Sequence, residues 1–200
     1  MVARNKDKLS FNTKSAGSIR IIAGKYRGRK LPVLNEEGLR PTTDRVKETL
    51  FNWLMPYING ANCLDCFAGS GGLGIEALSR GAELVTFLEL NKQTAQQLKQ
   101  NLSLINAVTG QVLQTDSLTF LNKTKGDSKN FFDVVFIDPP FRKGLLTQVC
   151  TQLSQDWLAD NALIYVESEV EYNCSELPVN WCLLKEKIAG QVAYRLYQNG

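Results

Sequence analysis

Apolar and polar positions follow two periods along the chain, and together they predict strands that alternate with helices. Short apolar runs with the length of buried strands occupy 62–64, 84–88, 111–114, 133–137 and 162–167. Helices are predicted between them, over 43–54, 72–80, 91–105, 117–122 and 145–155. Two further runs, 181–188 and 192–198, predict a terminal pair of strands. This alternation is typical of an α/β fold with a doubly wound, mostly parallel sheet.

The segment before this pattern predicts a β-hairpin followed by a helix. Residues 18–34 read as two short strands around a basic, glycine-containing tip at 25–29. The helix is capped by Thr42 or Thr43, and its apolar stripe consists of Val46, Leu50, Phe51 and Leu54. Arg45 and Lys47 lie off that stripe, and we expect both to be free for a substrate. We therefore divide the chain into a flexible basic tail (1–17), a hairpin-and-helix extension (18–56) and a main domain (57–200).

Charge is concentrated at the start of the chain, although the net charge is only +3. Residues 1–47 contain 12 Lys and Arg against 4 Asp and Glu, whereas residues 48–200 contain 11 against 16. A basic extension on an acidic domain favours a polyanion bound by the extension alone. A solvated basic turn would show the same composition. The candidate RNA-contacting residues are Arg20, Lys25, Arg27, Arg29, Lys30, Arg40 and Arg45.

A glycine-rich turn follows the first strand of the main domain. Gly69, Gly71 and Gly74 lie between a predicted strand and a predicted helix, where backbone N–H groups can meet a ligand. The G-x-G-x-x-G spacing selects no single cofactor, but the missing Gly-Lys-Ser/Thr excludes a P-loop. Glu89 ends the second strand twenty positions after Gly69 and can accept hydrogen bonds from both hydroxyls of a ribose. A third acid, Asp116, follows the end of the third strand, predicted over 111–114.

The tetrapeptide Asp138-Pro139-Pro140-Phe141 directly follows the apolar run 134–137. The two prolines end the strand and hold Asp138 in an extended conformation. The corner therefore offers a carboxylate, a proline carbonyl and an aromatic ring, which suit a planar amine on a base. An ordinary Asp-Pro turn is the simpler alternative.

Several classes of chemistry are excluded by composition. The chain has no histidine, which removes Ser-His-Asp and Cys-His catalysis and His-ligated metals, and we expect no metal. Its five cysteines are scattered, and we expect them to be small buried residues in a reducing cytoplasm. With 44% hydrophobic residues, 200 residues suffice for one α/β domain. No apolar run has the length of a membrane span, so we expect no membrane partner.

These motifs together resemble the class I, S-adenosylmethionine-dependent methyltransferases, and more narrowly the bacterial small-subunit ribosomal RNA guanine-N2 methyltransferase D (RsmD) family. The resemblance spans residues 18–198 and is most specific in the run from Arg40 to Glu48. It implies a seven-stranded Rossmann-like methyltransferase sheet with the last two strands as an edge hairpin. It also implies a monomer that acts on small-subunit (16S) ribosomal RNA within a partly assembled subunit.

The resemblance also assigns residues. Asp138, Pro139, Pro140 and Phe141 would grip and stack the target guanine. The glycine turn would hold the methionine moiety beside Asp65, Glu89 the ribose, and Asp116 the adenine amine. Ser117, at the start of the helix predicted over 117–122, and residues of the glycine turn complete the expected cofactor set. These turn residues are Phe67, Ala68, Gly69, Ser70 and Gly71.

Three rival functions remain at this point. A DNA adenine-N6 methyltransferase, or another amino-methyltransferase, would use a similar corner but would not need the basic hairpin. A dinucleotide-dependent oxidoreductase would use the glycine turn and Glu89 but not the corner. A non-catalytic RNA-binding protein would explain only the basic extension.

Overall fold

The computed structural model of the chain describes residues 17–34, 43–122 and 131–200. Its elements in chain order are β1 (Gly17–Arg20), β2 (Lys30–Val33), α1 (Asp44–Leu54), β3 (Asn62–Asp65), α2 (Gly72–Ser79), β4 (Leu84–Glu89), α3 (Lys92–Leu104), β5 (Gly110–Gln114), α4 (Ser117–Leu121), β6 (Phe132–Ile137), α5 (Leu145–Leu153), β7 (Leu158–Glu169), the 3-10 helix η1 (Cys174–Glu176), β8 (Trp181–Ala189) and β9 (Val192–Asn199). Most of the basic tail, Arg40 and Thr42 lie outside the described residues.

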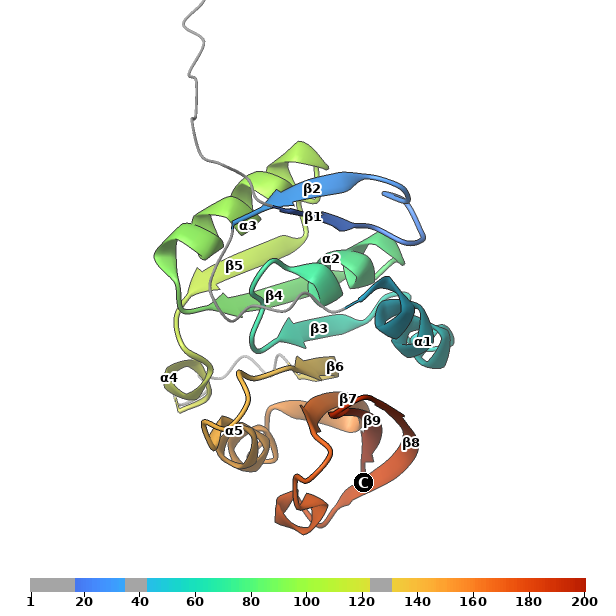
Figure 1. The fold of residues 1–200 in the computed structure, drawn as a ribbon, viewed down its shortest axis with the longest axis vertical. Helices are drawn as coiled ribbons and strands as arrows, with labels where there is room; N and C mark the ends of the chain where they lie inside the picture. Colours follow the sequence, from blue (N-terminus) through green and yellow to red (C-terminus); the bar gives the residue numbers. More distant parts are fainter. Residues whose placement is uncertain (1–16, 35–42, 123–130) are drawn as a thin grey trace, which may run out of the picture.

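One seven-stranded sheet forms the centre of the protein, with the strand order β5-β4-β3-β6-β7-β9-β8 (Figure 1). The strands from β3 to β7 pair in parallel, as the alternation of strands and helices predicts. β9 lies antiparallel to both β7 and β8, which confirms the expected edge hairpin. The strand order reverses between β3 and β6, and ligands of open α/β sheets bind at the carboxyl ends of the strands beside such a reversal.

Each face of the sheet is covered by its own set of helices, because alternate strand residues point to opposite faces. One face packs Phe87, Phe136 and Tyr165 against residues of α1, α2 and α3. The other face packs Val135 and Ile164 against α4 and α5. These strand residues are fully or almost fully buried, as expected for parallel strands covered on both faces.

The hairpin β1–β2 shares the hydrophobic core of the main sheet. Its register, from Gly17 opposite Val33 to Arg20 opposite Lys30, agrees with the predicted hairpin. Ile19, Ile21 and Leu31 are buried and belong to the same cluster as α1, α2 and α3. Figure 1 shows the hairpin over α2 and α3. The extension is therefore packed onto the main domain and does not stand apart from it.

The structure departs from the sequence-based expectations in the bounds of one strand, in one short helix and at the cysteines. β7 extends over Leu158–Glu169, well beyond the predicted 162–167, because β6 and β9 both pair with it. The short helix η1 was not predicted. Cys63, Cys66 and Cys150 are buried as expected, but Cys174 is only half-buried and Cys182 is exposed on the edge strand β8, so the expectation is wrong for these two. Within the described ranges, no helix is both long and apolar enough to cross a membrane.

Candidate functional site

Three acidic residues meet at the carboxyl edge of the sheet, where neighbouring strands end together. Asp65, the last residue of β3, lies opposite Phe87 of β4 and Phe136 of β6. Glu89 and Asp138 each follow two residues later, so they flank Asp65 on the two neighbouring strands. The sheet therefore brings together the glycine turn, the expected ribose acceptor and the Asp-Pro-Pro-Phe corner.

The carboxylate of Asp65, at the end of β3, is hydrogen-bonded to the end of the glycine turn. It is buried, and its Oδ2 accepts a hydrogen bond of 3.1 Å from the Gly74 N–H in the first turn of α2. Burial raises the pKa of Asp65 to about 7, and the charge of Glu89 adds to this, although the Gly74 hydrogen bond opposes it. The expected place of Asp65 beside the methionine amino group stays a prediction.

Gly74 is required by close packing. A Cβ atom at this position would lie 2.2 Å from the ring of Phe87 on β4. Gly71, the N-cap of α2, has a left-handed conformation with φ of 82°, which also favours glycine. The glycines therefore let α2 begin directly against the sheet, with its first N–H groups beside the strand ends.

Glu89 is oriented by two backbone donors. Its Oε2 accepts a hydrogen bond of 2.8 Å from the Gly69 N–H, and its Oε1 accepts one of 2.7 Å from the Asn91 N–H. The side chain is half-buried at the end of β4. The predicted hydrogen bonds from ribose hydroxyls to Glu89 stay a prediction.

Asp116 and Ser117 both lie at the start of α4. Asp116 is the N-cap, and its Oδ1 accepts a hydrogen bond of 2.8 Å from the Thr119 N–H. Hydrogen bonds from the Thr119 side chain and backbone lower the pKa of Asp116. Ser117 is buried, and its hydroxyl donates to the carbonyl of Cys66, which ties α4 to the end of β3.

The Asp-Pro-Pro-Phe corner leads the chain from β6 towards α5. Pro139 is buried, whereas Pro140 is exposed and Phe141 leaves 38% of its surface exposed. Arg142 follows with a left-handed φ of 60°, and its N–H donates to Oε1 of Glu169 on β7 at 2.7 Å. The corner is thus held against β7 with an aromatic ring facing solvent.

The predicted basic residues have different surroundings. Arg20, Lys25, Arg27, Lys30 and Arg45 are exposed. Arg29 is also exposed, but its Nη1 donates to the carbonyl of Leu104, the last residue of α3, at 3.1 Å. This contact complements the negative end of the helix dipole, so Arg29 has a structural partner besides any RNA.

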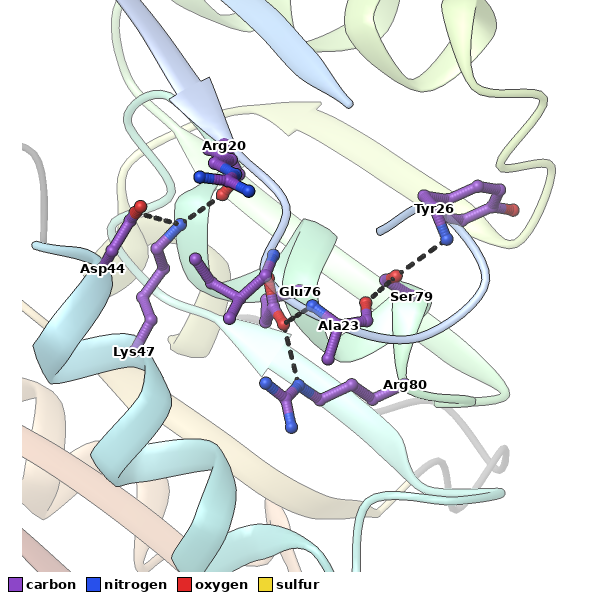
Figure 2. A network of polar contacts seen from close by, with 9 residues as sticks. Arg20, Ala23, Tyr26, Asp44, Lys47, Glu76, Ser79 and Arg80 are labelled. Atoms are coloured by element: carbon purple, nitrogen blue, oxygen red, sulfur yellow. Dashed lines mark hydrogen bonds and ion pairs between the residues drawn. The ribbon is translucent and has the colours of Figure 1, made fainter. Parts of the chain in front are cut away.

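The expectation that Lys47 is free for substrate is wrong. Only 2% of Lys47 is exposed, and its Nζ donates to the carbonyl of Arg20 at 2.6 Å and pairs with Asp44 at 3.4 Å (Figure 2). The helical pattern placed Lys47 off the apolar stripe, but the hairpin covers that side of α1. A lysine can be buried there because its charge is paired and hydrogen-bonded.

Glu76 and Ser79 of α2 anchor the turn of the hairpin, and the sequence patterns did not single out either residue. Glu76 accepts hydrogen bonds from the Ile22 and Ala23 N–H groups at 2.8 and 3.0 Å and from Arg80 Nε at 2.8 Å (Figure 2). Ser79 accepts from the Tyr26 N–H and donates to the carbonyl of Ala23. A charged residue within an apolar helical stretch was the available signal for Glu76.

A small pocket lies between the extension and the glycine turn. It is bordered by Ser70 and by residues of the β2 end and of α3: Pro32, Val33, Leu34, Thr94, Gln97, Leu98 and Asn101. Asn101 donates from Nδ2 to the carbonyl of Pro32 at 2.9 Å. The end of the hairpin therefore lies beside the expected cofactor turn.

The chain is similar to known proteins along most of its length. It is 59% identical to "Ribosomal RNA small subunit methyltransferase D" of Haemophilus influenzae over 186 residues, which cover 92% of this chain and 95% of the relative. It is 56% identical to the protein of the same name from Escherichia coli K12 over 188 residues, 94% of this chain and 93% of the relative. The family described as "Conserved hypothetical protein 95" matches residues 19–198.

The chain belongs to this small-subunit methyltransferase D family. The solved structure of yhhF from Escherichia coli superposes with a TM-score of 0.84 at 53% identity, covering 92% of this chain and 98% of that one. The match of the family includes the hairpin, the glycine turn, the Asp-Pro-Pro-Phe corner and the edge hairpin. The resemblance and the fold inferred from the motifs are both confirmed.

Proposed function

We propose that the chain transfers a methyl group from S-adenosylmethionine to the exocyclic N2 amine of a guanine in small-subunit ribosomal RNA. The observation that carries this proposal is the position of the Asp-Pro-Pro-Phe corner beside the glycine turn. β3 and β6 are parallel neighbours, and the Cys66 N–H donates to the carbonyl of Phe136 at 3.0 Å. A methyl donor on the turn and an amine at the corner would therefore lie next to each other.

The corner supplies what a weakly nucleophilic amine needs. The N2 lone pair of guanine is delocalised into the ring, so two acceptors for its hydrogens favour the pyramidal form that can attack. Asp138 and the carbonyl of Pro139 are suited to accept one N–H each, and the exposed ring of Phe141 is suited to stack on the base. The base would have to leave its stack to reach this corner.

The chemical step is an in-line displacement. The N2–methyl bond forms as the methyl–sulfur bond of S-adenosylmethionine breaks, the sulfur leaves as a neutral thioether, and one N2 proton leaves to Asp138 or water. Positioning of the two reactants contributes most of the acceleration in such a reaction. Methyltransferase relatives support S-adenosylmethionine as the cofactor, and its expected ligands are the glycine turn and Glu89.

The extension is the proposed RNA contact. Lys25 and Arg27 lie exposed on a turn whose backbone is anchored to α2, and Lys30 and Arg45 are exposed nearby in the same extension. Because this turn is already folded against α2, its basic side chains can bind RNA phosphates without the extension first having to fold on the RNA. Arg40 belongs to this proposal by sequence alone.

One experiment tests the reaction and its site together. Purified protein and radiolabelled S-adenosylmethionine are added to small-subunit particles and to naked ribosomal RNA from a strain that lacks the gene. Mass spectrometry of the digested RNA should find N2-methylguanosine at one position. Label on any other atom, or on no nucleotide, would contradict the proposal.

A further inference from the structure

A second carboxylate, Glu167, lies beside Asp138 at the carboxyl edge. β6 and β7 are parallel, with Phe136 opposite Tyr165 and Ile137 opposite Val166. Asp138 directly follows Ile137 past the end of β6, and Glu167 directly follows Val166 within β7. The two residues therefore lie on neighbouring strands, which are about 4.8 Å apart. Both follow by two positions a residue of the core on the α1 side, so both carboxylates belong to that face of the sheet.

Glu167 is held between two tyrosines. The buried Tyr165 hydroxyl donates to Oε2 of Glu167 at 2.8 Å. Tyr194 of β9 lies opposite Glu167 and is also buried. Burial, followed by the charges of Glu167 and Asp138, raises the pKa of the Tyr165 phenol, which therefore stays a donor. Glu167 itself is partly exposed.

Two neighbouring carboxylates favour a ligand that brings two neighbouring donors, because the like charges otherwise disfavour each other. The Watson–Crick edge of guanine presents such a pair, the N1–H and the N2 amine. Adenine and cytosine present a ring nitrogen acceptor beside their amine and would meet a carboxylate with a lone pair. Glu167 also has one methylene more than Asp138, which lets it reach past the amine towards N1.

We propose that Glu167 accepts the N1–H of the target guanine while Asp138 accepts an N2 hydrogen, so that Glu167 selects guanine among the bases. The inference rests on the proposed function, since it assigns a recognition contact to the same reaction. It adds a residue from β7, a strand in which the motifs indicated no site residue.

The test uses an RNA substrate in which the target guanine is replaced by 2-aminopurine. This base keeps the 2-amine but lacks the 6-oxygen, and its N1 carries no proton; the Glu167 variants therefore decide how much of the difference belongs to N1. Single-turnover methyl transfer by the wild type should be roughly 10- to 100-fold faster on guanine, the range of one good base-edge contact. Glu167→Gln should lower this ratio at least roughly tenfold, because a glutamine amide can donate to the N1 of 2-aminopurine.

Two further variants keep the result interpretable. Glu171→Gln makes the same chemical change at an exposed residue past the end of β7 and should leave the ratio unchanged. Glu167→Asp keeps the charge but shortens the reach, and should slow transfer to guanine without helping 2-aminopurine. Calorimetry with S-adenosylmethionine and thermal melting should show that all three variants fold and bind the cofactor.

The inference is overturned if the wild type methylates both bases equally fast. It is also overturned if Glu167→Gln slows both reactions by the same factor. Glu167 would then only hold the Tyr165 hydroxyl in place and would not contact the base. If the wild type does not methylate N2 of guanine at all, the proposed function fails first, and that result is separate from the ratios of the variants.

Discussion

The contact between Glu76 and the turn of the hairpin can be tested by removing the carboxylate. Glu76 is 1% exposed and accepts three hydrogen bonds, two from the backbone of Ile22 and Ala23 and one from Arg80. Glu76→Ala would leave two backbone donors without their acceptor and Arg80 without its ion pair. Removing one partner of a buried ion pair usually costs about 3–5 kcal/mol, and each unsatisfied donor about 1–3 kcal/mol.

We therefore expect Glu76→Ala to lower the free energy of unfolding by about 3–5 kcal/mol in urea titrations. Glu76→Gln should lower the free energy of unfolding by less, because its amide oxygen still accepts hydrogen bonds. Some loss remains, because its NH₂ group would face a backbone donor. Hydrogen exchange measured by mass spectrometry should show faster exchange over residues 17–34 in both variants. The loss should appear in this segment because all the described backbone donors to Glu76 belong to it.

The matched control is Glu83→Ala, an exposed glutamate on the connection between α2 and β4. An exposed substitution of this kind usually changes stability by less than about 0.5 kcal/mol. If Glu76→Ala and Glu83→Ala unfold with the same free energy, Glu76 does not anchor the hairpin. The same conclusion would follow if Glu76→Ala lost stability without faster exchange over 17–34.

Four further predictions concern the site. Asp65→Asn should flatten the pH dependence of stability. In the wild type, the unfolded chain loses the Asp65 proton near pH 4, whereas the folded protein keeps it until near pH 7. The wild-type free energy of unfolding therefore falls by up to about 1.4 kcal/mol per pH unit between these two values. Glu89→Ala should weaken S-adenosylmethionine binding by on the order of 1.5–3 kcal/mol in calorimetry. Asp138→Ala should keep cofactor affinity but slow single-turnover methyl transfer by roughly 10²–10³-fold, with Asp138→Asn in between. Lys25→Ala combined with Arg27→Ala should reduce the slope of log affinity for RNA against log salt by roughly 0.7–0.9 per lost phosphate contact.

Each of these predictions has a result that contradicts it. A wild-type pH slope in Asp65→Asn would show that this carboxyl ionises normally in the folded protein. Unchanged cofactor affinity in a folded Glu89→Ala would remove the ribose assignment. Wild-type transfer by Asp138→Ala would remove the amine acceptor, and an unchanged salt slope would make the basic turn a solvated surface.

Local sequence signals determined most of the fold and part of the candidate site. Short apolar runs predicted the strands of the parallel sheet, because strands covered by helices on both faces consist almost entirely of buried residues. Asp138 could be predicted because two prolines end a strand wherever the chain places them. The glycine turn and Glu89 were visible for the same reason: each follows a strand end directly. The resemblance to the family supplied the cofactor and the kind of reaction.

Tertiary structure alone decided what depends on contacts between distant segments. Lys47 looked exposed on its helix, but the hairpin covers it, and that contact joins residues 27 positions apart. Glu76 binds the backbone more than 50 residues earlier, which no periodicity records. Glu167 lies near Asp138 because β7 pairs with β6 in a register that sets Ile137 opposite Val166, which no local pattern records. The periods of a sequence encode which face a residue occupies, whereas its neighbours on that face follow from strand order and register.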